Sequence, residues 1–419
     1  MAFRFIHAAD IHLDSPLRGL ERYEGAPVDA IRQASRRALE NLVALAIAEQ
    51  VAFVIIAGDL FDGDWKDYNT GLYFVRQMAR LNDAGIEVYL LKGNHDAANK
   101  ISKSLPLPAN VRVFSHKAPE SFVIEKLNVL IHGQSFAAGD VRDDLSAAYP
   151  VAESGKFNIG VLHTCASGRD GHDAYAPCKI DGLISKGYNY WALGHVHKRE
   201  VLNRNPLIVF PGNIQGRHIR ETGEKGCMLL SVDDRFEVRE EFCELAVMRW
   251  ESLNVRIDEA RNEGELFLLF SQELSSLVLQ AAGMPLAVRV HLTGSSALDS
   301  QIRSNRKHIT ESLRALAMQQ GSDSIWIEKI KIETVPLSSS EQLSHYDGPL
   351  AELLSLINES KNDNDAILAL QDELQDLRTR LPAELPEANY LQSREWIKSA
   401  LDDVQQILLD RLMKPGATL

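Results

Sequence analysis

The chain has 419 residues, of which 45% are apolar and 25% charged, a composition typical of a globular protein with two or three folded units. No apolar run approaches the about 18–20 residues of a membrane-spanning helix, and the N-terminus lacks the features of a signal peptide, so we expect neither membrane insertion nor secretion. The four cysteines include no Cys-x-x-Cys pair, which argues against a zinc knuckle or a disulfide framework and favours reduced thiols in the cytoplasm.

The net charge of −13 is unevenly distributed along the chain. Residues 1–250 carry 29 Lys and Arg against 32 Asp and Glu, a net charge of −3, whereas residues 251–419 carry 16 against 26, a net charge of −10. Acidic proteins bind nucleic acid phosphates poorly, but bound divalent cations would bring the N-terminal part close to neutral. The N-terminal part therefore remains compatible with a nucleic acid substrate.

Residues 1–245 predict a layered α/β domain. Strand-like runs at residues 3–9, 52–57 and 87–91 alternate with helical periodicity at residues 28–50 and 69–82. Closely spaced strands with fewer helices follow, and they are predicted at residues 111–114, 121–124, 128–132, 158–163, 189–193, 207–210, 227–231 and 236–241. This change suits a second sheet packed on the first, so we expect a sandwich of helices and two sheets.

Residues 246–336 predict a small α+β domain, with strands at 250–257, 286–292 and 325–333 and helices at 258–281 and 297–319. Residues 337–419 predict two amphipathic helices separated by Pro382 and Pro386. Their apolar side chains recur at alternating steps of three and four, at Ile367, Leu370, Leu374, Leu377 and Leu381 and at Ile397, Leu401, Val404 and Leu408. The spacing suits either packing on the chain's own body or docking on the helices of a partner.

Five short motifs follow predicted strands. They are Asp10-Ile11-His12, Gly58-Asp59-Leu60-Phe61-Asp62, Gly93-Asn94-His95-Asp96, His163 and Gly194-His195-Val196-His197. Alternate side chains of an extended segment lie on one side, so Asp10 and His12 can share a cation, and a glycine permits a sharp exit from a buried strand. Together the motifs supply ligands for two metals. A carboxylate can bridge two cations about 3.5–4 Å apart, and Asp59 is the candidate for this bridge. Such a pair of cations binds both the attacking and the leaving oxygen of an in-line phosphoryl displacement.

In this order the motifs resemble those of the calcineurin-like metallophosphoesterases. The sequences of residues 8–14 and 58–62 are similar to those of the SbcD- and YhaO-like DNA repair exonuclease branch, and the resemblance covers about the first 240 residues. It implies a four-layer α/β/β/α fold, with the α+β domain as a cap over the site. It also implies two divalent metals, manganese in this branch with iron or zinc as alternatives, one bound by Asp10, His12, Asp59 and His197 and the other by Asp59, Asn94, His163 and His195.

The resemblance further implies that His95 binds no metal and faces the scissile phosphate, where it stabilises the transition state or protonates the leaving oxygen. Asp62 and Asp96 fit orienting roles near His95. In this chemistry, water activated by the metals attacks the phosphorus in line, and no covalent intermediate is required.

Several assignments have alternatives. His163 taken alone would be a structural residue, and His132 competes for the same role, but His163 ends a longer apolar run. The loop at residues 211–220 is either a solvated surface loop or a contact to a phosphate backbone through Arg217 and Arg220. Asp14 is expected to be a turn or capping residue.

The sequence therefore predicts a manganese-dependent hydrolase that cleaves DNA, specifically an exonuclease in DNA repair. The alternatives are a phosphoesterase for small nucleotides or phosphoproteins, and a non-catalytic subunit that recruits a repair ATPase. The resemblance implies that the C-terminal helices attach to the coiled-coil root of an ABC-type ATPase. A homodimer is common among relatives, but these residues show no sign of one.

Overall fold

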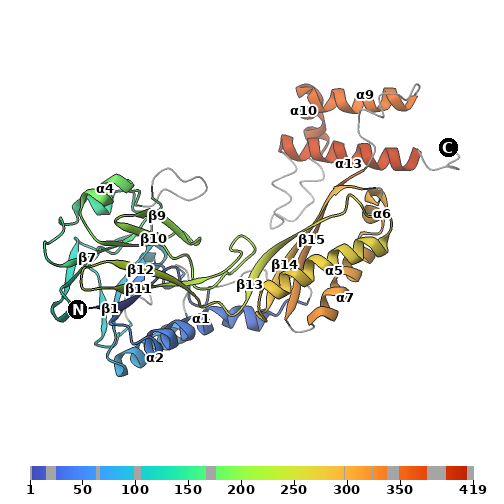
Figure 1. Cartoon of the computed structure of the whole chain (residues 1–419). Helices are drawn as coiled ribbons and strands as arrows, with labels where there is room; N and C mark the ends of the chain where they lie inside the picture. Colours follow the sequence, from blue (N-terminus) through green and yellow to red (C-terminus); the bar gives the residue numbers. More distant parts are fainter. Residues whose placement is uncertain are drawn as a thin grey trace. The chain divides into compact units, whose positions relative to one another are not determined.

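The computed structural model describes residues 2–15, 25–62, 67–98, 105–166, 176–296, 298–321, 324–336, 349–374 and 393–412. Figure 1 draws the chain, which divides into two compact units. The first comprises Met1–Val255, Phe267–Leu292 and Thr310–Lys331, and the second Arg256–Leu266, Thr293–Ile309 and Ile332–Leu419. The domain limits at residues 245 and 336 stay a prediction.

The first sheet has the strand order β12-β11-β1-β2-β3-β4. Its strands are β1 (Phe3–Ala8), β2 (Phe53–Ala57), β3 (Glu87–Leu91), β4 (Val111–Val113), β11 (Gly226–Val232) and β12 (Val238–Glu244). The four strands β1 to β4 run parallel, and β11 and β12 are added antiparallel beside β1. The helices α1 (Val28–Ala48) and α2 (Tyr68–Asp83) make the connections from β1 to β2 and from β2 to β3.

The second sheet has the order β5-β6-β7-β8-β10-β9. Its strands are β5 (Glu120–Ile124), β6 (Val129–Gly133), β7 (Phe157–His163), β8 (Tyr190–Gly194), β10 (Leu207–Phe210) and β9 (Glu200–Arg204). The four central strands are parallel, and β5 and β9 pair antiparallel at the edges. The prediction omitted β9, because an edge strand with polar side chains has little apolar alternation.

Alternating side chains of β1 belong to two apolar layers, one on each face of the first sheet. Phe3 and Phe5 belong to the cluster between the sheets, where Phe5 stacks on Phe53 with ring centroids 4.9 Å apart. Ile6 belongs instead to the cluster shared with α1 and α2. On the outer face of the second sheet, Trp191 packs in one cluster with Leu183 of the short helix α4 (Ile180–Ser185). The fold is therefore a four-layer α/β/β/α sandwich, which confirms the predicted fold class.

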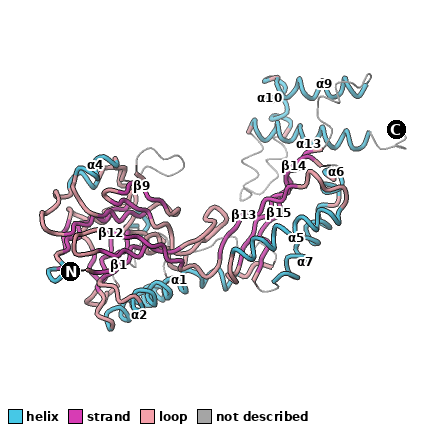
Figure 2. The backbone as a smooth tube through the Cα atoms, in the orientation of Figure 1, coloured by secondary structure: helices cyan, strands magenta, loops and turns pink. Residues whose placement is uncertain are grey.

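The next part of the chain forms a three-stranded sheet and helices (Figure 2). The elements are β13 (Arg249–Arg256), α5 (Glu263–Gln280), β14 (Leu286–Ser295), α6 (Asp299–Ser304), α7 (Arg306–Gly321) and β15 (Ile325–Val335). The helix predicted from residue 258 begins later, after Asn262, whose side chain accepts a hydrogen bond from the Glu265 N–H at 3.0 Å. The helix predicted at 297–319 is divided at Asn305, between α6 and α7.

Three C-terminal helices are described, α9 (Pro349–Asn362), α10 (Asn364–Glu373) and α13 (Arg394–Leu412), and they pack on one another. The helix is interrupted between α9 and α10 because Asp363 caps α10: its carboxylate accepts a hydrogen bond from the Asp365 N–H at 2.9 Å. The predicted residues Leu377, Leu381, Pro382 and Pro386 lie outside the described residues. In the described part of the chain, no helix has the length and apolar composition needed to cross a membrane.

Candidate metal centre

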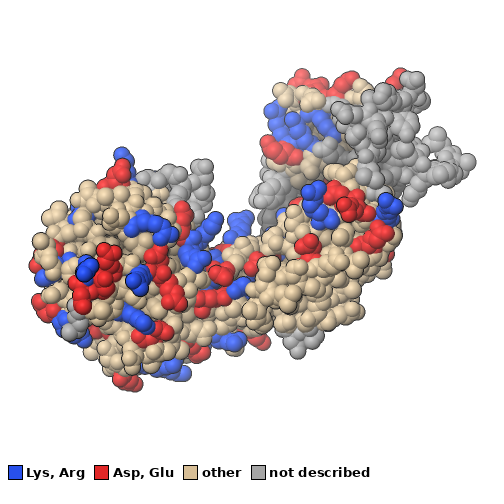
Figure 3. All heavy atoms as spheres, viewed as in Figure 1, with Lys and Arg blue, Asp and Glu red and all other residues tan. Residues whose placement is uncertain are grey.

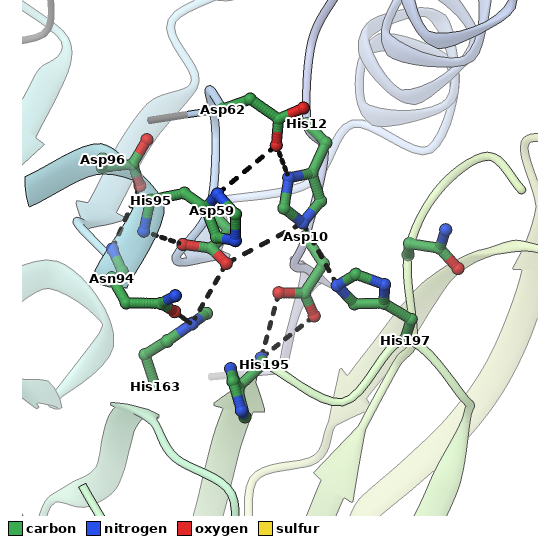
Figure 4. A network of polar contacts seen from close by, with 12 residues as sticks. Asp10, His12, Asp59, Asp62, Asn94, His95, Asp96, His163, His195 and His197 are labelled. Atoms are coloured by element: carbon green, nitrogen blue, oxygen red, sulfur yellow. Dashed lines mark hydrogen bonds and ion pairs between the residues drawn. The ribbon is translucent and has the colours of Figure 1, made fainter. Parts of the chain in front are cut away.

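Five segments bring polar side chains to one edge of the sandwich (Figure 4). The parallel strands of an α/β sheet end at a common edge, where ligands bind. Asp10 and His12 follow β1, Asp59 follows β2, Asn94 begins α3 (Asn94–Ala98) after β3, His163 ends β7, and His195 and His197 follow β8. The structure thus brings together all seven predicted metal ligands.

One group of ligand atoms comprises Asp10, His12 and His197, which lie within 4.8 Å of one another. The Nε2 atoms of His12 and His197 are 3.1 Å apart. Asp10 and His12 are buried, and the Asp10 carboxylate accepts the His195 backbone N–H at 3.0 Å. Carboxylate and imidazole groups therefore converge on one point.

A second group comprises Asp59, His163 and His195. The Nε2 atom of His163 lies 3.4 Å from Asp59 Oδ2 and 2.9 Å from Asn94 Oδ1. The same Asp59 oxygen lies 3.8 Å from His12 Nε2, which belongs to the first group. Asp59 is thus placed between the two groups, as a bridging ligand must be.

Three ligand imidazoles have their Nδ1 atom engaged with an oxygen, which leaves Nε2 for the centre. The contacts are His12 to Asp62 Oδ1 at 2.6 Å, His197 to Glu221 Oε1 at 2.7 Å and His163 to the Ala57 carbonyl at 3.0 Å. Metal-binding histidines commonly donate their second ring N–H to a carboxylate or a carbonyl, which fixes the tautomer. The donor set therefore fits divalent metals of the Mn²⁺, Fe²⁺ and Zn²⁺ type.

The Asp59 carboxylate and the His163 imidazole stabilise each other's charged forms. Burial alone would raise the pKa of Asp59, but the neighbouring His163 holds it well below its usual range. The Asp59 carboxylate likewise raises the pKa of His163 to about 9, against the opposing effect of burial. Because a ligating imidazole must be neutral, a divalent cation at this position replaces the ring proton as the counter-charge.

The backbone at the ligands is held in uncommon conformations. Asp10, His12 and Asp59 have φ values of 51°, 44° and 51°. These values lie in the left-handed region, which residues other than glycine rarely adopt. Hydrogen bonds between the first two motifs hold these residues, from the Asp10 N–H to the Gly58 carbonyl and from the His12 N–H to the Asp59 carbonyl, both 3.0 Å. These hydrogen bonds thus fix the two loops to each other as one unit.

Two glycines allow the ligands to approach the backbone. At Gly58, where φ is +100°, an added Cβ would lie 2.2 Å from Nδ1 of His163. At Gly93, an added Cβ would lie 2.3 Å from Oδ1 of Asp59. No side chain fits at either position unless a ligand moves.

Substitution of Gly58 should therefore disturb both stability and metal binding. We expect Gly155→Ala, at φ +81° with open space around it, to lower the free energy of unfolding by about 1–3 kcal/mol through strain alone. Gly58→Ala should cost more, because its methyl group displaces His163, and it should also weaken metal binding. Chemical denaturation and metal titration of both variants check this, and equal effects of the two substitutions would contradict it.

His95 stands beside the ligands with its side chain 43% exposed. Its backbone N–H donates to Asp59 Oδ1 at 3.0 Å, and its Nδ1 lies 3.5 Å from Asp62 Oδ1. His95, His12 and Asp62 also lie close enough to form a third group of potential ligands. Asp96 is buried, and its carboxylate accepts hydrogen bonds from the backbone N–H groups of Leu60, Phe61 and Gly93 at 2.9–3.1 Å. These bonds tie the second and third motifs together.

The loop predicted to contact a phosphate backbone contributes one arginine to the centre. The Arg217 side chain is only 15% exposed, and its guanidinium donates to Glu221 at 2.9 Å and approaches Asp62 to 3.7 Å. Arg220 is exposed. Sequence reasoning missed Glu221, because nothing in Glu221-Thr222-Gly223-Glu224 distinguishes the buried acid from the exposed one.

Two family profiles match the chain. The profile described as "Calcineurin-like phosphoesterase" matches residues 3–199, and that described as "Metallophosphoesterase YhaO, middle domain" matches residues 250–335. The "Uncharacterized metallophosphoesterase YhaO" of Bacillus subtilis is 35% identical over 354 residues, which cover 83% of this chain and 86% of that protein. This chain belongs to the calcineurin-like metallophosphoesterases.

More distant relatives of this metallophosphoesterase carry the name "DNA double-strand break repair protein Mre11". The protein of Sulfurisphaera tokodaii is 26% identical over 204 residues, covering 47% of this chain and 50% of that protein. The protein of Methanopyrus kandleri is 24% identical over 291 residues, covering 63% and 61%. The family uses divalent metals to hydrolyse phosphoesters, so this metallophosphoesterase is a hydrolase, and the clustered side chains are candidate ligands for those metals.

Asp14 and His132 lie outside the groups of potential ligands in this metallophosphoesterase and contact other side chains. Asp14 accepts hydrogen bonds from both Nε and Nη2 of Arg36, at 2.5–3.0 Å, and so joins the segment after the first motif to α1. His132 lies 2.7 Å from Oγ of Ser121 and stacks on Tyr188. The contacts of both residues are those of structural side chains.

Proposed function

We propose that this metallophosphoesterase hydrolyses phosphodiester bonds of DNA, as a manganese-dependent exonuclease in DNA repair. The observation that carries the proposal is the solvent-accessible His95 imidazole beside a full set of ligands for two metals. The Mre11 relatives support DNA as the substrate through their printed name. The more similar YhaO relative is described as uncharacterized, so it favours no particular phosphoester.

When bound, two divalent cations supply a nucleophile at neutral pH and neutralise charge on the phosphoryl oxygens. The protein supplies the proton donor. Burial would raise the pKa of Asp62, but its hydrogen bond with His12 holds it well below the usual range, so Asp62 is an anion beside Nδ1 of His95. Asp62 orients the ring through Nδ1, and the proton that His95 would donate to the leaving oxygen is the one on its Nε2.

The charges on the face visible in Figure 3 do not favour a polymer over a small substrate. Figure 3 shows Lys and Arg interspersed with Asp and Glu over the visible face, rather than gathered in one basic patch. We propose that Arg217, beside Asp62 in the centre, contacts the substrate phosphate and that the exposed Arg220 extends this contact along the backbone. The proposal therefore rests on the centre rather than on overall charge.

The substrate is tested by comparing three phosphoesters with the same protein and Mn²⁺. We expect release of nucleotides from linear DNA, little turnover of cyclic nucleotides or a chromogenic phosphomonoester, and loss of activity with a chelator. Efficient turnover of the small substrates with intact DNA would favour the alternative of a small-molecule phosphoesterase. Absence of turnover of all three, with metals bound, would favour a non-catalytic subunit.

We further propose that the C-terminal helices bind a coiled-coil ABC-type ATPase. Although the three helices bury Ile367 and Ile397 among themselves, they leave Leu356 and Leu368 more than half exposed, at 59% and 54%. Exposed leucines on amphipathic helices suit docking on partner helices.

A chain ending at residue 338 should therefore keep its phosphoesterase activity but lose the ATPase on co-purification. Leu368→Asp in the full chain should weaken that association, whereas Leu279→Asp, at an 81% exposed leucine of α5, should not. Undiminished recovery of the ATPase with the shortened chain would show that these helices are not the docking site.

A further inference from the structure

We propose that Glu221 is a positioning residue of the metal centre, which orients His197 toward the cation and holds Arg217 beside it. The proposal rests on the proposed metal-dependent function of this centre. Glu221 belongs to none of the five motifs, and it lies 24 residues beyond His197.

Five N–H groups converge on the Glu221 carboxylate, whose side chain is only 5% exposed. Oε1 accepts from His197 Nδ1 at 2.7 Å and from Arg217 Nη2 at 2.9 Å. Oε2 accepts from the Arg217 backbone N–H at 2.8 Å, from Asn213 Nδ2 at 2.9 Å and from Arg217 Nε at 3.3 Å. A carboxylate offers about four lone-pair sites, so its capacity to accept hydrogen bonds is filled.

The contact with His197 fixes the ring tautomer. With the Nδ1 proton donated to Glu221, Nε2 carries the lone pair and faces Nε2 of His12 at 3.1 Å. The segment that follows Glu221 also holds the main chain of this ligand, because Lys225 Nζ donates to the His197 carbonyl at 2.8 Å. Both the ring and the backbone of His197 are therefore set by residues 221–225.

The contact with Arg217 joins the two sides of the first metal group. His12 and His197 are anchored through Nδ1 by Asp62 and Glu221, respectively, and the Arg217 guanidinium lies between these two carboxylates. The Glu221 charge offsets that of Arg217 near bound cations, and without it only Asp62, at 3.7 Å, would face the guanidinium. Removal of the Glu221 charge should therefore disfavour the metal through both geometry and electrostatics.

The substitution Glu221→Gln tests this role with little change in size. Glutamine offers one oxygen with two lone pairs and places an NH₂ group against other donors, so several of the five N–H groups lose their acceptor. We expect the wild type to bind two Mn²⁺ per chain in calorimetric titration. The variant should keep one at wild-type affinity and bind the other about 10–100-fold more weakly, which is the usual loss when the partner of a ligating histidine is replaced.

A matched control lies three residues further along. Glu224 is 52% exposed, and its carboxylate approaches Arg199 and Arg249 only to 3.8–3.9 Å. Glu224→Gln should bind both Mn²⁺ with wild-type affinity. A purely structural role of Glu221 would instead lower the unfolding temperature of the metal-free variant and leave both affinities unchanged, and that result would overturn the proposal.

If Glu221→Gln does not fold, the double substitution Glu221→Leu with Arg217→Met keeps the test open. Apolar replacement of both partners of a buried ion pair is far less disruptive than removal of one. The second Mn²⁺ should again bind more weakly, because His197 has lost its acceptor, and two sites of wild-type affinity would contradict the proposal. These titrations need no DNA, so a wild type that binds two Mn²⁺ but leaves DNA intact would contradict the proposed function alone.

Discussion

The variant His95→Asn is expected to lose phosphodiesterase activity by about 10²–10⁴-fold while binding both metals with wild-type affinity. The imidazole is exposed and lies beside Asp62, outside the two groups of ligand atoms that contain Asp59 and Asp10. The hydrogen bond from residue 95 to Asp59 comes from the backbone, so it survives the substitution. The loss should therefore appear in kcat rather than in metal affinity.

Turnover of linear DNA and calorimetric titration with Mn²⁺ check this expectation on the same preparation. His116→Asn, at an exposed histidine far from the motifs in sequence, serves as the control and should keep full activity. Robust turnover by His95→Asn would remove His95 from the chemistry. Loss of a metal would show instead that His95 is a ligand, as its proximity to His12 and Asp62 also permits.

The variant Asp59→Asn is expected to lose both the activity and the stabilisation that metal gives. The Asp59 carboxylate lies 3.4 Å from His163 and 3.8 Å from His12, so it is shared by the two ligand groups. An amide carries no charge to hold two cations. A ligand at 100 times its Kd stabilises the wild type by about 2.7 kcal/mol per site, and that increment should vanish in the variant at the same Mn²⁺ concentration.

Thermal unfolding with and without Mn²⁺ measures this increment. The comparison is made within each variant, because the substitution also removes the charge that pairs with His163 in the metal-free protein. Asp140→Asn, at an exposed aspartate paired with Arg142, should retain the full increment. An undiminished increment in Asp59→Asn would show that Asp59 does not bridge the metals.

The fold and the ligands were predictable because both depend on local patterns that the topology repeats. Apolar runs of strand length ending in a polar residue recur at β1, β2, β3, β7 and β8, and parallel strands deliver such ends to one edge. Asp10, Asp59 and His163 could therefore be placed together without coordinates. The edge strand β9 and the break at Asp363 were not predicted, because polar residues in both segments obscure the apolar alternation that defines an element.

The roles of Arg217 and Glu221 could not be predicted, because they depend on burial by distant segments. Arg217 lies in a basic loop where the sequence alone does not distinguish a phosphate contact from a buried ion pair. Its partner Glu221 is buried, whereas Glu224 three residues later is exposed. Only the folded loop shows which glutamate contacts His197.

Anomalous diffraction from crystals of this protein grown with Mn²⁺ tests the metal centre most directly. Two peaks are expected at the edge where the parallel strands end, one contacted by Asp10, His12 and His197, the other by Asn94, His163 and His195, with Asp59 touching both. A map with no peak there, and with these side chains bonded to one another instead, would contradict the two-metal centre.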